Sequence, residues 1–185
     1  MRRFPSGRYR KQVLQFFPAP FRPPLRPFVV LVFAWSGDRV LVCQIEDRGW
    51  CVPSGRIEPQ EHPEDAARRE AMEEGGAVLG DLLYLGTYQM REGSNVRWAS
   101  CYVCELQSLG PIPEWTESTG CRLLRLEELP GVYHIWNQLT EQVFRYSFEV
   151  LQRHRQRIGV SRIDVGAADE APPPPDGSSS PERSA

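Results

Sequence analysis

Residues 55–77 read Gly-Arg-Ile-Glu-Pro-Gln-Glu-His-Pro-Glu-Asp-Ala-Ala-Arg-Arg-Glu-Ala-Met-Glu-Glu-Gly-Gly-Ala, and this stretch decides which fold to expect. Its charged residues and glycines stand at characteristic, unequal spacings. The residues that define the spacing are Gly55, Glu61, Arg69, Glu70, Glu73, Glu74 and Gly76. The arrangement predicts a loop that leads into a single acidic helix.

The second half of the stretch carries the signals of a helix with defined ends. Pro63 suits the first helical position, where its missing N–H costs nothing. Two carboxylates follow in the first turn, where they favour the positive end of the helix. The pair Gly75-Gly76 can end the helix, because glycine tolerates the left-handed cap conformation. The sequence therefore predicts a helix over residues 63–74, capped by one of the two residues before the proline.

Three carboxylates of this helix share one face. At about 100° per residue, Glu70, Glu73 and Glu74 span an arc of roughly 100°, where like charges repel one another. A hard divalent cation would relieve the repulsion, and oxygen ligands at this density suit Mg²⁺ or Mn²⁺. The alternative is a solvated acidic face with Arg68 and Arg69 as local partners. The loop before the helix favours the metal site, since residues 50–55 read as a short strand and tight turn that can bring a backbone carbonyl towards the carboxylates.

The spaced residues resemble the Nudix box at each of its fixed positions. The resemblance extends over roughly residues 28–156, and it implies an α/β/α sandwich with a mixed β-sheet. It also implies a hydrolase that cleaves the pyrophosphate bond of a nucleoside diphosphate linked to another group, with Mg²⁺ (or Mn²⁺) as cofactor.

The resemblance also implies roles for single residues. Glu73 and Glu74 would be the principal metal ligands, and the backbone carbonyl of Ser54 would lie near the metal. Glu70 would be a further ligand or the base that takes a proton from the attacking water. Arg69 would orient the carboxylates through its planar guanidinium.

A carboxylate from outside the helix is also expected. Three carboxylates from one helix cannot enclose an octahedral ion that also holds phosphate and water. In MutT-like enzymes a further carboxylate comes from the loop before a late strand, and counting back from residues 122–126 points to Glu117 as a catalytic residue, with Glu114 as the rival. A solvated loop acid is an equally good interpretation of either residue.

The substrate class is inferred by elimination. The sequence lacks the proline that ADP-ribose hydrolases of the family usually carry after the box, and Tyr88 comes too early for the tyrosine of diadenosine polyphosphate members. A MutT-type nucleoside triphosphate pyrophosphohydrolase is the preferred interpretation. The alternatives are a non-catalytic Nudix-like nucleotide-binding regulator and an ADP-ribose or nucleotide-sugar hydrolase. Trp98, Tyr102 and Trp115 could stack on a base, although aromatic residues in strands more often belong to the core.

Composition limits the partners. The 185 residues carry a formal charge of −2 and a pI near 6.0, which gives no global attraction to nucleic acid or membranes. We therefore expect a small nucleoside diphosphate derivative as partner, no stable nucleic-acid complex, no membrane association, and a homodimer as one option. Five scattered cysteines are expected to be free and buried in a reducing cytoplasm.

Along the chain, three regions differ in composition. Residues 1–27 form a basic, Pro-rich N-terminal extension that either contacts a polyanion or packs over the domain. Residues 28–158 are expected to form a domain that resembles the Nudix fold. It would comprise two strands joined by a hairpin at residues 36–38, the acidic helix, further strands, and a helix predicted over residues 133–156. Residues 159–185 are expected to be a disordered Pro/Ser-rich tail. Strands on both sides of one helix, closed by a second helix, predict a mixed sheet with helices on both faces.

Overall fold

The computed structural model describes residues 2–166. The compact unit that carries the site runs from Met1 to Arg153, and a second unit begins at His154. The prediction of a disordered tail falls mostly on residues 167–185, which lie outside the described residues. Before them, the second helix continues to Gly166.

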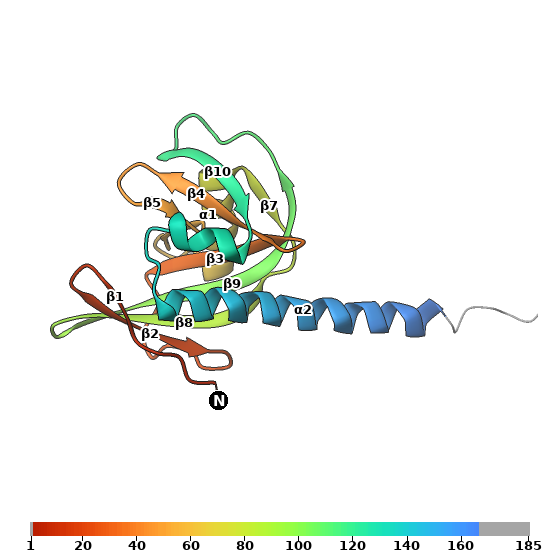
Figure 1. Ribbon diagram of the computed structural model, residues 1–185, viewed down its shortest axis with the longest axis horizontal. Helices are drawn as coiled ribbons and strands as arrows, with labels where there is room; N and C mark the ends of the chain where they lie inside the picture. The colour runs from red at the N-terminus through yellow and green to blue at the C-terminus, as the bar shows by residue number, and fades with distance from the viewer. Residues whose placement is uncertain (1, 167–185) are drawn as a thin grey trace, which may run out of the picture. The chain divides into compact units, whose positions relative to one another are not determined.

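The centre of the first unit is a 10-stranded sheet with the main order β1-β2-β8-β9-β3-β4-β10 (Figure 1). Three short strands branch from it: β5 pairs with β4, β6 with β3 and β7 with β9. The strands are β1 (Gly7–Tyr9), β2 (Gln12–Pro18), β3 (Val29–Ser36), β4 (Arg39–Ile45), β5 (Gly49–Cys51), β6 (Ser54–Arg56), β7 (Ala77–Leu79), β8 (Leu83–Glu92), β9 (Asn95–Leu109) and β10 (Ser118–Leu124). Strand β3 runs parallel to β9, whereas its pairings with β4 and β6 are antiparallel, so the sheet is mixed as predicted.

Helix α1 (Pro63–Gly75) and the part of α2 (Gln138–Gly166) that belongs to the first unit lie on opposite faces of this sheet. Successive strand residues point to opposite faces. On one face Leu41 and Cys43 of β4 lie under Gly75 at the end of α1. On the other face Phe33 packs edge-on against Phe144 of α2. The central strands are apolar along nearly their whole length because both of their faces are covered, and the predicted α/β/α arrangement is confirmed.

The ends of α1 follow from the residues that the sequence places there. Pro63 occupies the first turn, and the side chain of His62 accepts a hydrogen bond from the N–H of Glu64. Gly76 closes the helix at φ 59° and ψ 25°. A side chain there would collide with the backbone of Gly110, so glycine is required both by the left-handed backbone and by the close approach.

The sheet extends into the segment that was assigned to an N-terminal extension. Residues of β2 pair with β8 from Val13↔Arg91 to Pro18↔Gly86, and Figure 1 shows the red β1–β2 hairpin beside β8. Its aromatic residues pack onto the domain, which is one of the two interpretations of this segment. For example, Phe16 contacts Tyr88 edge-on. The hairpin is thus a structural part of the unit that carries the site.

Helix α2 begins later than its apolar periodicity suggested. A 3₁₀ helix at Leu126–Gly131 precedes it, and Asn137 then caps the start of α2. The side-chain oxygen of Asn137 accepts hydrogen bonds from the N–H groups of Leu139 and Thr140 at 2.9 and 3.1 Å. Residues 133–137 therefore form a loop before the helix, and three of them line a cavity beside β3.

Candidate active site

A cavity of about 720 Å³ opens where β6 meets the acidic face of α1. Four carboxylate residues line it, together with two arginines and part of the loop before β10. The lining comprises Phe28, Val29, Arg48, Ser54, Gly55, Arg56, Glu70, Glu73, Glu74, Trp115, Thr116 and Glu117. The structure thus brings every residue predicted for the site to one cavity, except Arg69. Arg69 is not a lining residue, but it donates hydrogen bonds to the lining carboxylates of Glu70 and Glu73.

Helix α1 presents its carboxylates because its alanines face the sheet. Ala66, Ala67 and Ala71 are fully buried, and their small side chains let the helix lie close to the strands. Glu70 and Glu74 lie beside these alanines on the helix, and only 8% and 6% of their surfaces are exposed. Carboxylates are seldom buried this deeply without partners, so their contacts decide what the site can do.

Glu74 is held by the loop at Ser54 and by Arg48. One carboxylate oxygen, Oε2, accepts the backbone N–H of Ser54 at 2.8 Å. The other, Oε1, pairs with the guanidinium of Arg48 at 2.6 Å. Burial nevertheless raises the pKa of Glu74 from its ordinary 4.5 to about 7, against the opposing effects of Arg48 and the Ser54 N–H. Burial thus makes this carboxyl group hold a proton more readily than an exposed one would.

Arg69 connects three carboxylates of the box. Its guanidinium binds both oxygens of Glu61, at 2.8 and 3.0 Å. The same group reaches Glu70 at 2.8 Å and Glu73 at 3.2 Å. The hydrogen bond to Arg69 lowers the pKa of Glu61. This is the arrangement that a residue orienting the carboxylates needs, and that role for Arg69 stays a prediction.

Glu70 lies against the backbone at Gly55. A β-carbon added at Gly55 would fall inside the carboxyl group of Glu70, so this position accepts only glycine while Glu70 keeps its place. Burial raises the pKa of Glu70, and the neighbouring Arg69 opposes the shift. A carboxylate with a raised pKa is better suited to accept a proton than an exposed one.

The donor set at this cavity fits a hard divalent cation. Carboxylate and carbonyl oxygens are the ligands that Mg²⁺ and Mn²⁺ prefer, and the cavity offers Glu70, Glu73, Glu74, Glu117 and the carbonyl of Ser54. Within residues 2–166, no three Asp, Glu, His or Cys side chains are already gathered as a ligand cluster. The box carboxylates are turned to Arg48 and Arg69 instead.

Glu117 lines the cavity opposite the helix, whereas Glu114 is not among the lining residues. We expect Glu117→Gln to lower kcat roughly tenfold, the scale of an outer contributor to a metal site, with little change in KM. Glu114→Gln is the matched control and should change neither constant. Steady-state kinetics of both variants decide the matter. A large loss in Glu114→Gln with a silent Glu117→Gln would show that the assignment is wrong, and two silent variants would remove both loop acids from the site.

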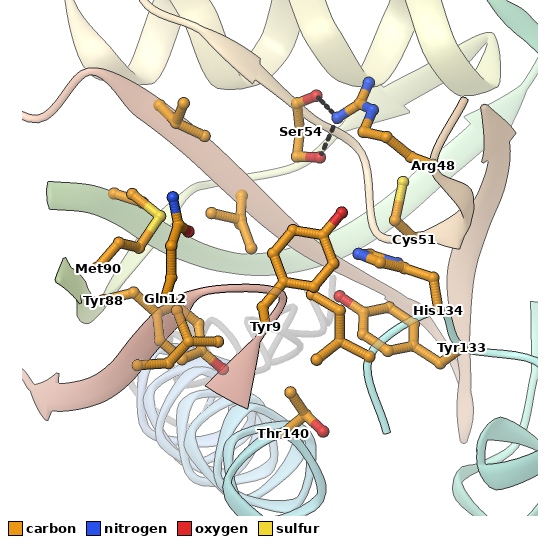
Figure 2. Close-up of a pocket in the computed structure, with 15 residues that line it drawn as sticks. Tyr9, Gln12, Arg48, Cys51, Ser54, Tyr88, Met90, Tyr133, His134 and Thr140 are labelled. Atoms are coloured by element: carbon orange, nitrogen blue, oxygen red, sulfur yellow. Dashed lines mark hydrogen bonds between the residues drawn. The ribbon is translucent and has the colours of Figure 1, made fainter. Parts of the chain in front are cut away.

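A second, mostly apolar cavity of about 180 Å³ adjoins the first, since both are lined by Val29, Arg48 and Ser54. Figure 2 shows the ring of Tyr9 in this lining, with Gln12 and Met90 on one side and Tyr133 and His134 on the other. The lining is completed by Leu14, Leu31, Cys51, Tyr88, Ala99, Ile135 and Thr140. The β1–β2 hairpin and the loop before α2 thus build walls of this cavity.

The sequence did not point to this second cavity or to Arg48. Neither Tyr9 nor His134 lies in a spaced motif, and Arg48 belongs to a short turn before the box. The aromatic residues proposed for base stacking fare differently. Trp98 and Tyr102 are 5% and 2% exposed and belong to the core, while Trp115 is 73% exposed and lines the larger cavity. The five cysteines are free, and only Cys121 is not fully buried.

No helix within residues 2–166 is long and apolar enough to cross a membrane.

Comparisons with known proteins give the family of the chain. The NUDIX domain family model matches residues 24–146. The chain is 36% identical over 104 residues to a putative 8-oxo-dGTP diphosphatase, YtkD, of Bacillus subtilis, an alignment that spans 56% of this chain and 65% of the relative. It is 40% identical over 75 residues to an RNA pyrophosphohydrolase of Bartonella henselae, over 36% of this chain and 43% of the relative. The chain thus covers less than two thirds of either relative's length.

Solved structures give the same result for the fold. The pyrophosphohydrolase BsRppH of Bacillus subtilis superposes with a TM-score of 0.65 at 28% identity, over 83% of this chain and 98% of that one. A NUDIX hydrolase from Nitrosomonas europaea gives a TM-score of 0.57 at 17% identity, over 68% and 90% of the two chains. The family model covers most of the chain and includes the whole box, and the chain therefore belongs to the Nudix family of hydrolases.

Proposed function

We propose that this chain is a Mg²⁺- or Mn²⁺-dependent pyrophosphohydrolase of nucleoside triphosphates. The observation that carries the proposal is the pair of adjoining cavities. The larger is lined by four carboxylates and two arginines, and the smaller is mostly apolar. A nucleotide has the same two halves, a polyphosphate that binds through cations and a flat base that binds by burial. The smaller cavity, at about 180 Å³, suits a base rather than a whole nucleotide.

The protein groups at the larger cavity would have separate roles. Glu73, Glu74 and the Ser54 carbonyl would hold the cation, which when bound neutralises phosphate charge and acidifies water. Glu70, whose pKa burial raises, would accept the proton of the attacking water. Arg69 would keep Glu70 and Glu73 in place through the two hydrogen bonds that it donates to them.

At the smaller cavity, aromatic rings would contact the base. Tyr9 packs edge-on against His134, with ring centroids 5.6 Å apart, and Tyr133 is buried beside them. Gln12 and Thr140, together with Arg48 and Ser54, supply polar groups in a mostly apolar lining. A few placed polar groups in an apolar pocket are what orients a ligand of this kind.

A second candidate, an RNA 5′-triphosphate end, is favoured by two comparisons. One relative is an RNA pyrophosphohydrolase, and the structure with a TM-score of 0.65 is a pyrophosphohydrolase, BsRppH. Both substrates present the same triphosphate to the carboxylates. They differ only beyond the first nucleoside, where the RNA continues as a chain and the free nucleotide ends.

The test is a substrate panel with Mg²⁺ and identification of the products. It contains the common nucleoside triphosphates, 8-oxo-dGTP, a 5′-triphosphorylated RNA, ADP-ribose and nucleotide sugars. We expect cleavage of one or more free triphosphates between phosphates. Cleavage of the RNA alone would support the second candidate. Cleavage of ADP-ribose alone, or tight binding without any product, would overturn the proposal in favour of a nucleotide-sugar hydrolase or a regulator. Glu74→Gln protein, purified in parallel, controls for contaminating pyrophosphatases.

A further inference from the structure

Arg48 contacts two groups of the cation site at once. Its Nη1 donates to the backbone carbonyl of Ser54 at 3.1 Å and to the hydroxyl at 3.2 Å. Its Nη2 donates to Oε1 of Glu74 at 2.6 Å. Figure 2 shows the two bonds to Ser54 as dashed lines. Arg48 lies outside the spaced residues of the box, in the turn between β4 and β5.

The oxygens that Arg48 engages are those that the proposed function gives to the cation. A guanidinium and a divalent ion are both positive and repel each other at the short distances that the Ser54 carbonyl and Oε1 of Glu74 impose. The two occupants would therefore compete for these oxygens.

We propose that Arg48 is a built-in substitute for the cation: it keeps Ser54 and Glu74 together until the cation binds, and then turns to the phosphates of the substrate. This inference rests on the proposed function. It makes Arg48 a positioning residue for the metal ligands, and a phosphate-binding residue once they are occupied.

The burial of the two partners supports an exchange of this kind. The Glu74 side chain is 8% exposed, and a carboxylate left alone at that depth is costly. Arg48 is a partner that can leave, since 35% of its side chain is exposed and it borders the larger cavity. Meanwhile Oε2 of Glu74 stays bound to the Ser54 N–H at 2.8 Å. One oxygen of the carboxylate is thus fixed and the other is exchangeable.

Released from Glu74, the guanidinium would be free to bind the phosphate oxygens of a substrate. The N–H donors of a guanidinium lie in one plane and can bind two phosphate oxygens at the same time. Arg48 also lines the smaller cavity, so it stands where the polyphosphate of a bound nucleotide would meet the base.

The test compares Mn²⁺ affinity, measured by titration with electron paramagnetic resonance in the absence of nucleotide, among four proteins. They are the wild type, Arg48→Gln, Arg48→Lys and the matched control Arg56→Gln. Arg56 lines the same cavity, but within residues 2–166 its side chain has no hydrogen bond or ion pair to Ser54 or Glu74. Arg56→Gln therefore reports the general effect of removing one positive charge.

We expect Arg48→Gln to bind Mn²⁺ at least about tenfold more tightly than Arg56→Gln does, because no charge-assisted hydrogen bond has to be broken first. Arg48→Lys keeps the charge but cannot make all three contacts, so it should also bind Mn²⁺ more tightly than the wild type. In turnover, both Arg48 variants should raise KM more than they lower kcat. Equal Mn²⁺ affinity in Arg48→Gln and Arg56→Gln would overturn the inference.

The outcomes separate this inference from the proposed function. If the wild type binds Mn²⁺ and cleaves a triphosphate while the Arg48 variants behave like the control, only the role of Arg48 is wrong. If none of the four proteins binds Mn²⁺, both fail. If Arg48→Gln does not fold, Arg48→Lys still decides, since a general charge effect predicts no change in that variant.

Discussion

Turnover is expected to stop in EDTA and to return when Mg²⁺ or Mn²⁺ is added in excess. Four carboxylates line the cavity that would receive the triphosphate, and without a cation they would repel its negative charge. Of the arginines at the site, Arg48 and Arg69 are already paired with carboxylates, and Arg56 supplies a single further charge. They leave little positive charge to neutralise a second anion.

The measurement is product release with and without the chelator, on whichever substrate the panel identifies. Ca²⁺ is an informative addition, because its longer bonds and looser geometry should support binding better than turnover. Full activity in EDTA would remove the metal from the mechanism. In that case the carboxylates would need another explanation.

Glu74→Gln should lower kcat by at least about 10², the scale seen when a single group that stabilises the transition state is removed. The amide keeps the shape of the carboxylate and can still accept the N–H of Ser54. It loses the negative charge that a cation needs. Glu74 is the best choice for this experiment because it is the most buried of the box carboxylates and contacts both Ser54 and Arg48. A folded, fully active variant would contradict the assignment.

The same variant is also expected to change how the stability of the folded protein depends on pH. In the folded protein Glu74 keeps its proton up to about pH 7, whereas the unfolded chain loses it near 4.5. Between these values only the folded state holds the proton, so the wild type loses stability as the pH rises. Glu74→Gln lacks this term, and it should gain up to about 3 kcal/mol relative to the wild type across that window. Thermal unfolding of both proteins in EDTA from about pH 4.5 to 8 measures the gap, which should stop growing above about pH 7.

The sequence predicted best those parts of the fold that depend on local signals. Helix α1 was predicted over residues 63–74 and runs over Pro63–Gly75, because proline and glycine act on their own neighbours. The hairpin between β3 and β4 was predicted from the turn at residues 36–38, where Gly37 takes a φ of 63°. The spacing of the box placed its carboxylates on one face, because that geometry is fixed by the pitch of a single helix.

The features that the sequence could not show depend on contacts between distant segments. The β1–β2 hairpin joins the sheet through β8, and nothing in a basic, Pro-rich segment indicates which edge it would meet. The second cavity is assembled from that hairpin, β3, β8 and the loop before α2. Arg48 reaches Glu74 across 26 positions of the chain. Contacts between residues so far apart in the chain leave no periodic pattern in the sequence. They can be seen only in the folded structure.

The parallel pairing of β3 with β9 has a consequence for how the protein folds. Val29 pairs with Ala99, and the whole box lies on the chain between them. Closing so long a loop is entropically costly, and long-range pairings of this kind slow folding. Helix α1 can begin to coil early through its local signals, but two of the strands that it packs against depend on later parts of the chain, since β7 pairs with β9 and β10 follows β9. A fragment that ends before β9 therefore contains the complete box as sequence without the complete surface that makes it a site.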